Sequence, residues 1–378
     1  MTIAAHITCN KHTGKSFLFE SLSRLAVSYA DAHFIFFIDK ANKYTSTPQK
    51  NCTYVLVSPK IKNTLSRLYW YNYKLPILLK RYDAGVFLSE DGMLSLRTRK
   101  AQMMIISEVE LFKKLISTTV QRRAYQKRFF ISFLKIASAV ILTEKHIAET
   151  LALNYPFITN KCTLIYHGLS ENYKPITWEQ KEEITLQYTD DKDYFIYPVS
   201  AGTKNNIINV LKAFSQFKKW QKSNMQLLLF VQGIPGGELI KDFHLYKYRT
   251  AVKIIGQEND EQAALITASA YAVIYLPSAE NTDDYPLNAM NCEVPVISIE
   301  NNLTKDIYNK AVVYTLNNSK SIAEKMMLLY KDENLRKDCI QQGLQLTARY
   351  SWHNTTHFLW QDIEKVMPVN VLTLQLNR

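Results

Sequence analysis

Short runs of β-branched and aromatic residues alternate along the chain with longer segments in which apolar residues recur every three or four positions. In the first half the short runs cover 2–8, 33–39, 52–58, 84–89, 103–107, 139–143 and 163–167. In the second half they cover 194–200, 226–233, 252–256, 271–277, 294–299 and 311–316. Apolar runs of this length predict buried strands, and the segments between them predict helices. The alternation therefore predicts parallel sheets built from strand-helix-strand units.

The helical pattern is clearest in the second half of the chain. In 206–220, Ile207, Leu211 and Phe214 recur at helical spacing and would pack on a sheet. The other helical segments that we name are 17–30, 261–270, 285–292 and 321–332. These helices, placed between the predicted strands, favour doubly wound α/β architecture.

One segment interrupts the pattern and suggests a division into two domains. Residues 171–193 are polar and charged, contain a proline and lack a strand-like core, so they predict the interdomain crossing. We expect an N-terminal, acceptor-side Rossmann-like domain over 1–170 and a second Rossmann-like domain over 194–350, which face a central cleft. We expect 351–378 to form a C-terminal helix and tail that pack back toward the first domain. Ligands of such sheets bind beyond the carboxyl ends of the strands.

Length and composition agree with two globular domains, since 378 residues with 47% apolar content are enough for two cores. The five cysteines lie far apart without metal-ligand spacing, which indicates thiols in a reducing compartment. The longest apolar stretch, 129–142, is short and contains Lys135, so no transmembrane helix is predicted. The N-terminus lacks the pattern of a signal peptide. We therefore expect a cytoplasmic protein.

The charge is unevenly distributed. Residues 1–170 carry 24 basic and 10 acidic side chains, whereas 171–378 carry 22 and 24. This asymmetry predicts an anionic partner for the first half, either a membrane surface or a charged substrate. No nucleic-acid-binding motif is present, so nucleic acid is not expected. Segment 113–138 has seven basic residues, and it predicts either peripheral contact with the inner face of an anionic membrane or an ordinary solvated helix face.

The stretch PSAENTDDYPLNAMNCEVPVIS, 277–298, is the clearest candidate for a ligand-binding loop. It leaves the carboxyl end of a predicted strand, and Pro286 fits the first turn of the following helix. A loop that leads into a helix N-terminus offers backbone amides and a favourable dipole to an anion such as a diphosphate. The alternative is that Asp283 or Asp284 caps the helix.

The order of motifs in the second half resembles the nucleotide-sugar-binding domain of family 4 glycosyltransferases, which have the GT-B fold and transfer sugars with retention. The matching segments are SAGTKNNIINVLKAF, LLLFVQG, VKIIG, AYAVIYLPS, NCEVPVI and YSW. The family's two glutamates, with seven residues between them and Ala-Met after the second, correspond to Glu280 and Asn288, which Ala289 and Met290 follow. In the first half TGKSFLFESLSRLA, SLRTRKAQMMIISEVELF, AVILTEKH and TLIYHGLSENYKP match more weakly.

Carried over position by position, the resemblance implies a donor site in the second domain. Glu280 would contact hydroxyl groups of the donor sugar and Lys204 would be the cation for the diphosphate, and these two are the catalytic residues that it implies. The other donor contacts fall on Gly202, Thr203, Asn205, Thr282, Asp283 and Asn288, with Gly202 near the phosphates and Asn288 at the ribose. Acceptor-side positions fall on Gly14 and Ser107. No metal ligand is implied.

The chain departs from the family at this donor site. Asn205 stands where a second cation is usual, Asn288 where a glutamate binds the ribose, and Ser107 where many members have a histidine. Residues 281–284, Asn-Thr-Asp-Asp, replace a glycine-rich segment. An aspartate about 4 Å from a phosphate would cost roughly 1 to 4 kcal/mol at a surface-like dielectric. Either these carboxylates act as caps or the donor site is weakened.

The resemblance implies an enzyme that moves a sugar from a UDP-, GDP- or ADP-sugar to a glycan or lipid-linked acceptor, with retention and without a metal or other cofactor. The leaving diphosphate can take the acceptor proton while cations stabilise it. The departures keep two alternatives open. One is a GT-B protein that has lost catalysis and serves as a binding or assembly partner, and the other is an enzyme with another reaction, such as sugar-nucleotide epimerisation.

Overall fold

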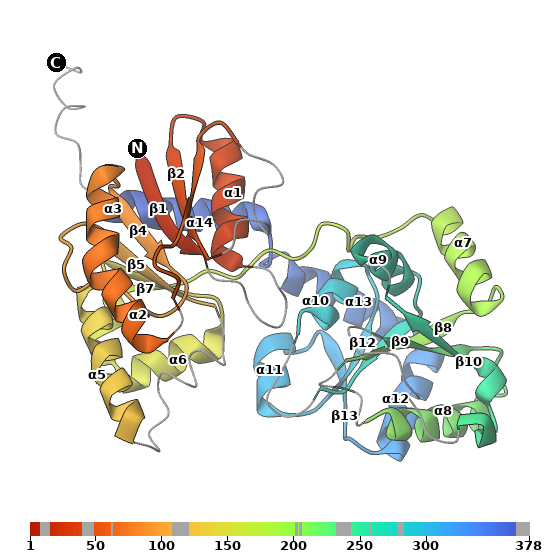
Figure 1. Cartoon of the computed structure of the whole chain (residues 1–378). Coiled ribbons are helices and arrows are strands. Elements are labelled where there is room, and N and C mark those ends of the chain that lie inside the picture. The colour runs from red at the N-terminus through yellow and green to blue at the C-terminus, as the bar shows by residue number, and fades with distance from the viewer. Residues whose placement is uncertain are drawn as a thin grey trace. The chain divides into compact units, whose positions relative to one another are not determined.

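A computed structural model describes residues 1–7, 16–39, 49–61, 63–107, 121–200, 203, 206–231, 243–257, 259–277 and 283–367. The chain divides into two units (Figure 1): unit 1 contains Met1–Gly168 and the residues from Ser351 onward, and unit 2 contains Leu169–Tyr350. Each unit has its own parallel sheet covered by helices on both faces. This is the doubly wound α/β class that the strand-helix alternation predicts.

Unit 1 is built on a seven-stranded sheet in the order β3-β2-β1-β4-β5-β6-β7, counted over the described residues. Its strands are β1 (Thr2–Ile7), β2 (His33–Ile38), β3 (Cys52–Leu56), β4 (Val86–Ser89), β5 (Ala101–Ile106), β6 (Ala139–Leu142) and β7 (Cys162–Leu164). Its helices are α1 (Phe17–Ser28), α2 (Thr64–Tyr69), η2 (Trp70–Lys74), α3 (Leu75–Arg81), α5 (Gln121–Ile136), α6 (Lys145–Asn154), η3 (Pro156–Lys161) and α14 (Trp352–Val366). The strand order reverses between β1 and β4, where such sheets bind ligands.

Alternation along β1 decides what lies on each face of this sheet. Ile3, Ala5 and Ile7 join the core beneath α1 and α14, whereas Ala4 joins the core beneath η2 and α3 on the opposite face. Side chains of successive strand residues point to opposite faces. His6, which alternates with Ala5, therefore lies on the side of the sheet that η2 and α3 cover.

Residues 64–81 form one helical rod with a π-turn in its middle, because α2, η2 and α3 follow each other without a break. Pro76 lies inside the rod, where a proline ring would clash with the carbonyl four residues earlier in an α-helix. The Leu75 N–H instead bonds the carbonyl of Trp70, five residues earlier. The wider turn accommodates the proline and buries the consecutive side chains of Trp70 and Tyr71. Such π-turns are often found at functional sites.

The last described helix, α14, packs on unit 1. Trp360 stacks on Tyr29 at the end of α1, with ring centroids 3.6 Å apart. The Thr355 hydroxyl donates to the carbonyl of Tyr166 at 2.7 Å. These contacts anchor the helix that the sequence places in the C-terminal tail.

Unit 2 has a six-stranded sheet over the described residues, in the order β10-β9-β8-β11-β12-β13. Its strands are β8 (Tyr194–Val199), β9 (Gln226–Val231), β10 (Val252–Gly256), β11 (Ala272–Tyr275), β12 (Val296–Ile299) and β13 (Val312–Thr315). Its helices are α7 (Trp178–Thr189), α8 (Ile207–Gln221), η5 (Phe243–Leu245), η6 (Arg249–Ala251), α9 (Asp260–Ala268), α10 (Tyr285–Asn291), α11 (Asn302–Tyr308), α12 (Ser319–Lys331) and α13 (Glu333–Thr347). The order reverses between β8 and β11.

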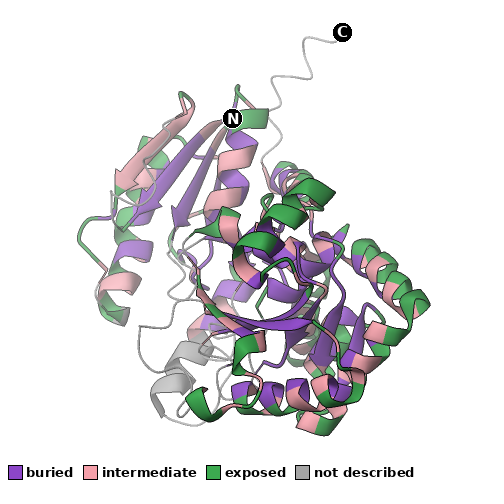
Figure 2. Ribbon diagram, turned by 90° about the vertical axis from the view of Figure 1, so that its right-hand side faces the viewer, coloured by how far each residue is buried: buried purple, intermediate pink, exposed green. Residues whose placement is uncertain are grey.

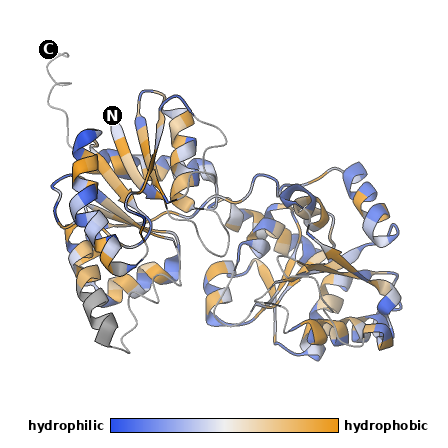
Figure 3. Ribbon diagram, in the orientation of Figure 1, coloured by the Kyte–Doolittle hydropathy of each residue, from blue (hydrophilic) through white to orange (hydrophobic). Residues whose placement is uncertain are grey.

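The observed elements agree closely with the predicted ones. Each described strand overlaps a run predicted from the sequence. The inner strands of both sheets are buried and apolar, whereas the edge strands β3, β7 and β10 are partly exposed (Figures 2 and 3). Segment 171–193, expected as the interdomain crossing, contains α7, which belongs to unit 2. Segment 129–142 divides between the end of α5 and β6. Within the described residues no helix is long and apolar enough to cross a membrane.

Candidate functional site

Polar side chains gather at the carboxyl edge of the unit 1 sheet, near the reversal of strand order. His6 lies near the end of β1 and Asp39 follows β2. Ser89 ends β4, with Glu90 and Asp91 next, and Ser107 follows β5. All six residues contact others of this group or the start of α1, and together they form a polar network in two parts.

Glu90 binds the N-terminus of α1. Its carboxylate accepts hydrogen bonds from the Ser16 hydroxyl at 2.6 Å and from the N–H groups of Phe17 at 3.1 Å and Leu18 at 3.3 Å. The Ser107 hydroxyl donates a further bond at 2.7 Å. A carboxylate is stabilised at this end of a helix dipole. The anion position of the first helix is therefore filled by a side chain of the protein itself.

His6 belongs to a second, buried part of the network. The Tyr71 hydroxyl donates to Asp91 Oδ1 at 2.7 Å, and it lies 2.9 Å from Nδ1 of His6. Because the hydroxyl proton is used by Asp91, the Nδ1 of His6 is the donor to Tyr71. The Ser89 hydroxyl and the N–H of Met93 also bond Asp91 Oδ1, at 2.8 and 3.1 Å. The π-turn supplies Tyr71 to this network.

The charges of these groups are coupled. Burial lowers the pKa of His6, but the carboxylates of Asp39 and Asp91 outweigh it and raise the pKa to about 9. Burial also raises the pKa of Asp91, but His6 and Arg67 outweigh it and lower that pKa to about 2. Nε2 of His6 is 3.8 Å from Asp39 Oδ1, and Nδ1 is 3.6 Å from Asp91 Oδ2. At neutral pH His6 is therefore a buried cation and not a proton acceptor.

In unit 2, the loop after β8 contains four of the predicted donor contacts. Gly202, Lys204 and Asn205 lie outside the described residues. Thr203 is buried, its hydroxyl donates to the carbonyl of Pro198 at 2.7 Å and accepts from the Ser200 N–H at 2.8 Å. Both hydrogen bonds of the Thr203 hydroxyl therefore stabilise the loop that contains it.

Asn206 connects the loop ends at the carboxyl edge of this sheet. Its amide nitrogen donates to the carbonyl of Leu276 after β11 at 2.9 Å, and its amide oxygen accepts from Asn317 after β13 at 3.0 Å. The side chain of Asn206 therefore does not cap α8, which it precedes. Within the part of the chain that the structure describes, no side chain caps the N-terminus of this helix.

The loop after β11 is described only in part. Glu280 and Thr282 lie outside the described residues. Asp283 Oδ1 accepts the N–H of Tyr285 at 3.0 Å, and the Asp283 N–H donates to the Tyr275 hydroxyl at 2.9 Å. Asp283 thus makes the capping contact that was the alternative to a ligand contact. Desolvation of its carboxyl group and the charge of the neighbouring Asp284 raise the pKa of Asp283. Asp283 is nevertheless an exposed residue, so contact with solvent makes this rise in pKa smaller.

Asn288, the predicted ribose contact, lies on α10. Its backbone N–H bonds the carbonyl of Asp284 at 2.8 Å. Its side-chain oxygen is buried and has no hydrogen-bond partner among the described residues. A buried acceptor of this kind can accept a hydrogen bond from a ligand hydroxyl, as a ribose would offer.

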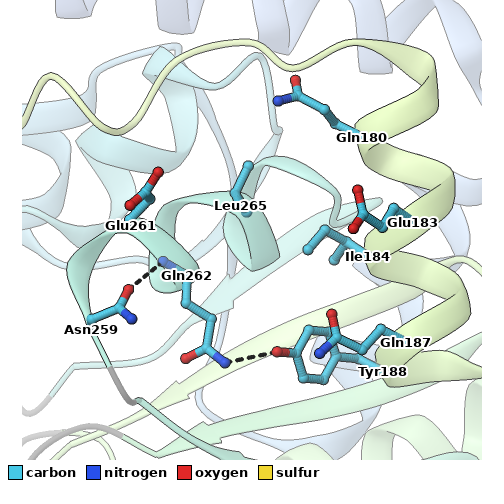
Figure 4. Close-up of a pocket in the computed structure, with 9 residues that line it drawn as sticks. All are labelled: Gln180, Glu183, Ile184, Gln187, Tyr188, Asn259, Glu261, Gln262 and Leu265. Atoms are coloured by element: carbon cyan, nitrogen blue, oxygen red, sulfur yellow. Dashed lines mark hydrogen bonds between the residues drawn. The ribbon is translucent and has the colours of Figure 1, made fainter.

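A separate hollow of about 290 Å³ lies between α7 and α9 of unit 2 (Figure 4). Gln262 donates to the Tyr188 hydroxyl at 2.7 Å across it. Glu183 and Glu261 also line it, and none of the predicted donor residues does. Two carboxylates disfavour a diphosphate there, so this hollow is not the donor site.

Sequence reasoning missed Glu90, His6 and Asp91. The acidic pair Glu90–Asp91 directly after a strand was an available indication, since strand ends carry binding residues in this architecture. Ser107 lies at the strand end where it was predicted, and its observed partner is Glu90. Gly14 lies outside the described residues. Among the described residues no cluster of histidine, cysteine, aspartate and glutamate suits a metal ion.

Solved structures of known proteins have the same fold as this chain. A glycosyltransferase from Rickettsia africae is similar over 97% of this chain and 98% of its own, with a TM-score of 0.71 and 13% identity. Anabaena Alr3699/HepE in complex with UDP is similar over 96% of this chain and 99% of its own, with a TM-score of 0.69 and 12% identity. The same protein in complex with UDP-glucose gives a TM-score of 0.66 at 13% identity, over 97% and 100% of the two chains. The GT-B fold is thus confirmed.

The sequence itself matches a family. Residues 179–346, nearly all of unit 2, match the family described as Glycosyl transferases group 1. A search of curated proteins finds no significant match. The predicted resemblance to this class of glycosyltransferases is therefore confirmed, and it rests on residues 179–346. The family match supports glycosyl transfer as the activity, whereas the structural similarity shows the fold.

Proposed function

We propose that the protein transfers a sugar from a nucleoside diphosphate sugar to a glycan or lipid-linked acceptor, with retention and without a metal or other cofactor. A difference between helices α1 and α8 supports the proposed location of the donor. The N-terminus of α1 in unit 1 is bound by Glu90, whereas the N-terminus of α8 in unit 2 has no side-chain cap among the described residues. Because a helix N-terminus attracts a phosphate, the diphosphate belongs with α8, inside the family-matched region.

Four of the predicted donor residues directly precede this helix in the sequence, and the other four lie in the loop after β11 or on α10. Gly202 lets the backbone approach the phosphates, and Lys204 neutralises the charge that develops on the leaving diphosphate. Glu280 holds hydroxyls of the sugar, and Asn288 accepts a bond from the ribose. Thr203, Asn205, Thr282 and Asp283 complete the proposed donor loops.

The proposed step needs no enzyme nucleophile. The acceptor oxygen attacks the anomeric carbon on the face that the diphosphate leaves, and the bond from that carbon to the phosphate oxygen breaks. The acceptor proton passes to the diphosphate. Cationic and backbone N–H groups around the diphosphate lower the barrier because they stabilise charge that grows in the transition state.

The acceptor belongs, in this proposal, with unit 1 and the residues Gly14 and Ser107. A lipid-linked acceptor would hold the protein at the inner face of a membrane, as a cytoplasmic protein in peripheral contact with anionic lipid. The rival is a protein of the same fold that binds a nucleotide sugar, or an assembly partner, without transferring the sugar. Asn205, Asn288 and the Asp283–Asp284 pair, where the family has other residues, favour the rival.

Calorimetric titration with UDP, GDP and ADP tests the donor site, and UDP comes first because Alr3699/HepE binds it. We expect one nucleotide to bind with a micromolar to sub-millimolar Kd. Lys204→Gln should weaken it about tenfold, whereas Lys212→Gln, an exposed lysine on α8, should not. Binding of none of the three nucleotides would contradict the proposal.

Incubation with the matching nucleotide sugars then separates the enzyme from its rival. We expect release of the nucleoside diphosphate, retained activity with a chelator, and a product whose anomeric configuration equals that of the donor, as read by NMR. Nucleotide binding without turnover on any glycan or lipid-linked acceptor would favour the rival. Interconversion of sugar nucleotides without transfer would indicate an epimerase.

A further inference from the structure

The helical rod 64–81 of unit 1 has an apolar outer side. Trp70, Tyr71, Leu75 and Leu79 on its inner side are buried in the core. Four large apolar side chains, each four residues from the next, are exposed on its outer side: Leu65, Tyr69, Tyr73 and Ile77. Leu65 and Ile77, at the two ends, are 77% and 65% exposed. We call these four residues the apolar stripe.

The π-turn keeps the apolar stripe straight. In an α-helix a step of four residues advances about 40° beyond a full turn, so three steps would drift about 120° around the rod. The wider turn over Trp70–Lys74 needs more residues per turn and reverses part of this drift. Tyr69 and Tyr73, one such step apart, are stacked with ring centroids at 5.4 Å. The four side chains therefore share one face of the rod.

The loop before β5 widens the apolar stripe into a surface. Leu96 is exposed, and the guanidinium of Arg97 lies 4.2 Å from the centre of the Tyr73 ring. A shallow hollow of about 430 Å³ connects this loop to the rod and to α5, with Leu68, Tyr69, Asn72, Tyr73, Leu96, Arg97 and Phe129 as its lining. Exposed apolar side chains that lie next to each other in this way mark an interaction site.

The charge around this surface is mostly positive, although Lys100 pairs with Asp83 at 3.3 Å and Arg67 lies 3.9 Å from Asp91. The three segments whose described side chains form it, 64–81, 93–100 and 129–136, contain eight lysine and arginine residues and no aspartate or glutamate. A second copy of the chain would bring like charges together on this surface. Tyrosines and aliphatic residues among basic side chains suit the interface of a bilayer, where rings and aliphatic groups enter the headgroup region and cations meet anionic lipid.

We infer that the apolar stripe and the lysine and arginine side chains of the same three segments dock the protein on an anionic lipid surface. We call these lysine and arginine residues the basic surround. This inference deepens the proposed function, because it names the residues that bring unit 1 to a lipid-linked acceptor. It differs from the expectation for 113–138 alone, since the apolar contacts come from the rod 64–81. It uses residues of unit 1 only, so it can fail while the donor site of unit 2 is intact.

Flotation with vesicles tests the inference. The full chain should float with vesicles of phosphatidylcholine and phosphatidylglycerol, and much less with phosphatidylcholine alone. The double variant Leu65→Ser/Ile77→Ser should partition roughly tenfold more weakly, because two apolar groups no longer enter the interface. The control Val27→Ser removes an apolar side chain that is 71% exposed on α1, on the opposite face of the sheet, and should bind as the wild type.

Charge variants test the basic surround. Lys74→Gln/Arg97→Gln should weaken flotation with anionic vesicles severalfold at low salt and less at high salt, where screening is stronger. Lys320→Gln/Lys331→Gln removes two exposed charges from unit 2 and should have no effect. UDP titration of each variant reports the donor site separately.

Three results would overturn the inference. The first is no flotation of the wild type with either vesicle, and the second is equal flotation of Leu65→Ser/Ile77→Ser and wild type. The third is a dimer of the wild type, lost in the double variant, without vesicle binding. Loss of nucleotide binding with intact flotation would instead contradict the proposed function alone.

Discussion

The imidazole of His6 lies 3.6 Å from the carboxylate of Asp91 in the interior of unit 1, and both groups are charged at neutral pH. Asp39 faces the other nitrogen of the ring at 3.8 Å. An imidazolium held between two carboxylates makes folding depend on pH, since the unfolded chain releases that proton near pH 6.5.

The sign of this dependence follows from the raised pKa of His6. Its contribution to stability is complete below about pH 6.5 and is lost as the pH rises to about 9. We expect the free energy of unfolding of the wild type, relative to that of His6→Gln, to fall by roughly 2 to 3 kcal/mol across this range. Urea unfolding at several pH values measures it. A difference that does not vary with pH would show that His6 is neutral in the folded protein.

Glu90 provides a second prediction, because its carboxylate holds the start of α1. Glu90→Gln replaces one acceptor oxygen with a donor that faces backbone N–H groups, and it should lower the free energy of unfolding by about 1 to 2 kcal/mol. Ser107→Ala removes one hydrogen bond to Glu90 and should cost about 1 kcal/mol. Chemical unfolding measures both changes.

Two controls separate this role from others. Glu149→Gln alters an exposed glutamate of α6 and should change stability by less than about 0.5 kcal/mol. Nucleotide affinity should be the same in Glu90→Gln and wild type, because Glu90 belongs to unit 1. A loss of affinity without a loss of stability would place Glu90 in the donor site instead.

Gly168 offers a prediction about the anchoring of α14. A methyl group at Gly168 would lie 2.3 Å from Cγ of Trp352, a ring that Arg24 covers at 4.7 Å. Gly168→Ala should therefore cost roughly 1 to 3 kcal/mol, the usual range for overpacking. At Gly85 the nearest atom, at 2.7 Å, is the flexible end of Met367. Gly85→Ala should cost less than about 1 kcal/mol, and equal thermal midpoints of the two variants would contradict the argument.

The fold was largely predictable because the strands of both units are buried apolar runs between turn residues. The rod 64–81 was not predicted, since Pro76 inside an aromatic segment is typical of a helix end rather than a continuous helix. The helix continues through Pro76 because the Leu75 N–H bonds the carbonyl of Trp70 across the wider π-turn. Helix α7 was missed because its surface is mostly polar, so the segment has the character of a linker.

The sequence places Asn288 on the helix after β11 because the motif has a fixed order along the chain, and its contact with a ribose stays a prediction. The contacts of His6 were not predictable, because they depend on strand order. His6 and Ser89 are paired residues of β1 and β4, 83 positions apart in the sequence. Only the sheet order places Asp91 beside His6. The order of strands in the sheet therefore decides which charged residues meet in the interior. The local pattern of residues along the chain does not give that order.

The last prediction separates the two proposed contacts of the donor. Glu280→Ala should remove bonds to the sugar, so turnover should fall far more than affinity for the bare nucleotide. Asn288→Ala should weaken the nucleotide itself, because the buried side-chain oxygen of Asn288 has no other partner among the described residues. Asn288→Glu should tighten the nucleotide by about 1 kcal/mol, since a charged acceptor forms a stronger bond with the ribose.

Titration of the three variants with the free nucleoside diphosphate, beside a transfer assay, measures these effects. Asn291→Ala on the same helix is the control, because its amide donates to the carbonyl of Tyr173 at 2.7 Å and is already used within unit 2. It should alter stability and leave nucleotide affinity close to that of the wild type. If Asn288→Glu leaves affinity unchanged and Glu280→Ala leaves turnover intact, the loop after β11 does not bind a sugar nucleotide, and Asp283 serves only to cap α10.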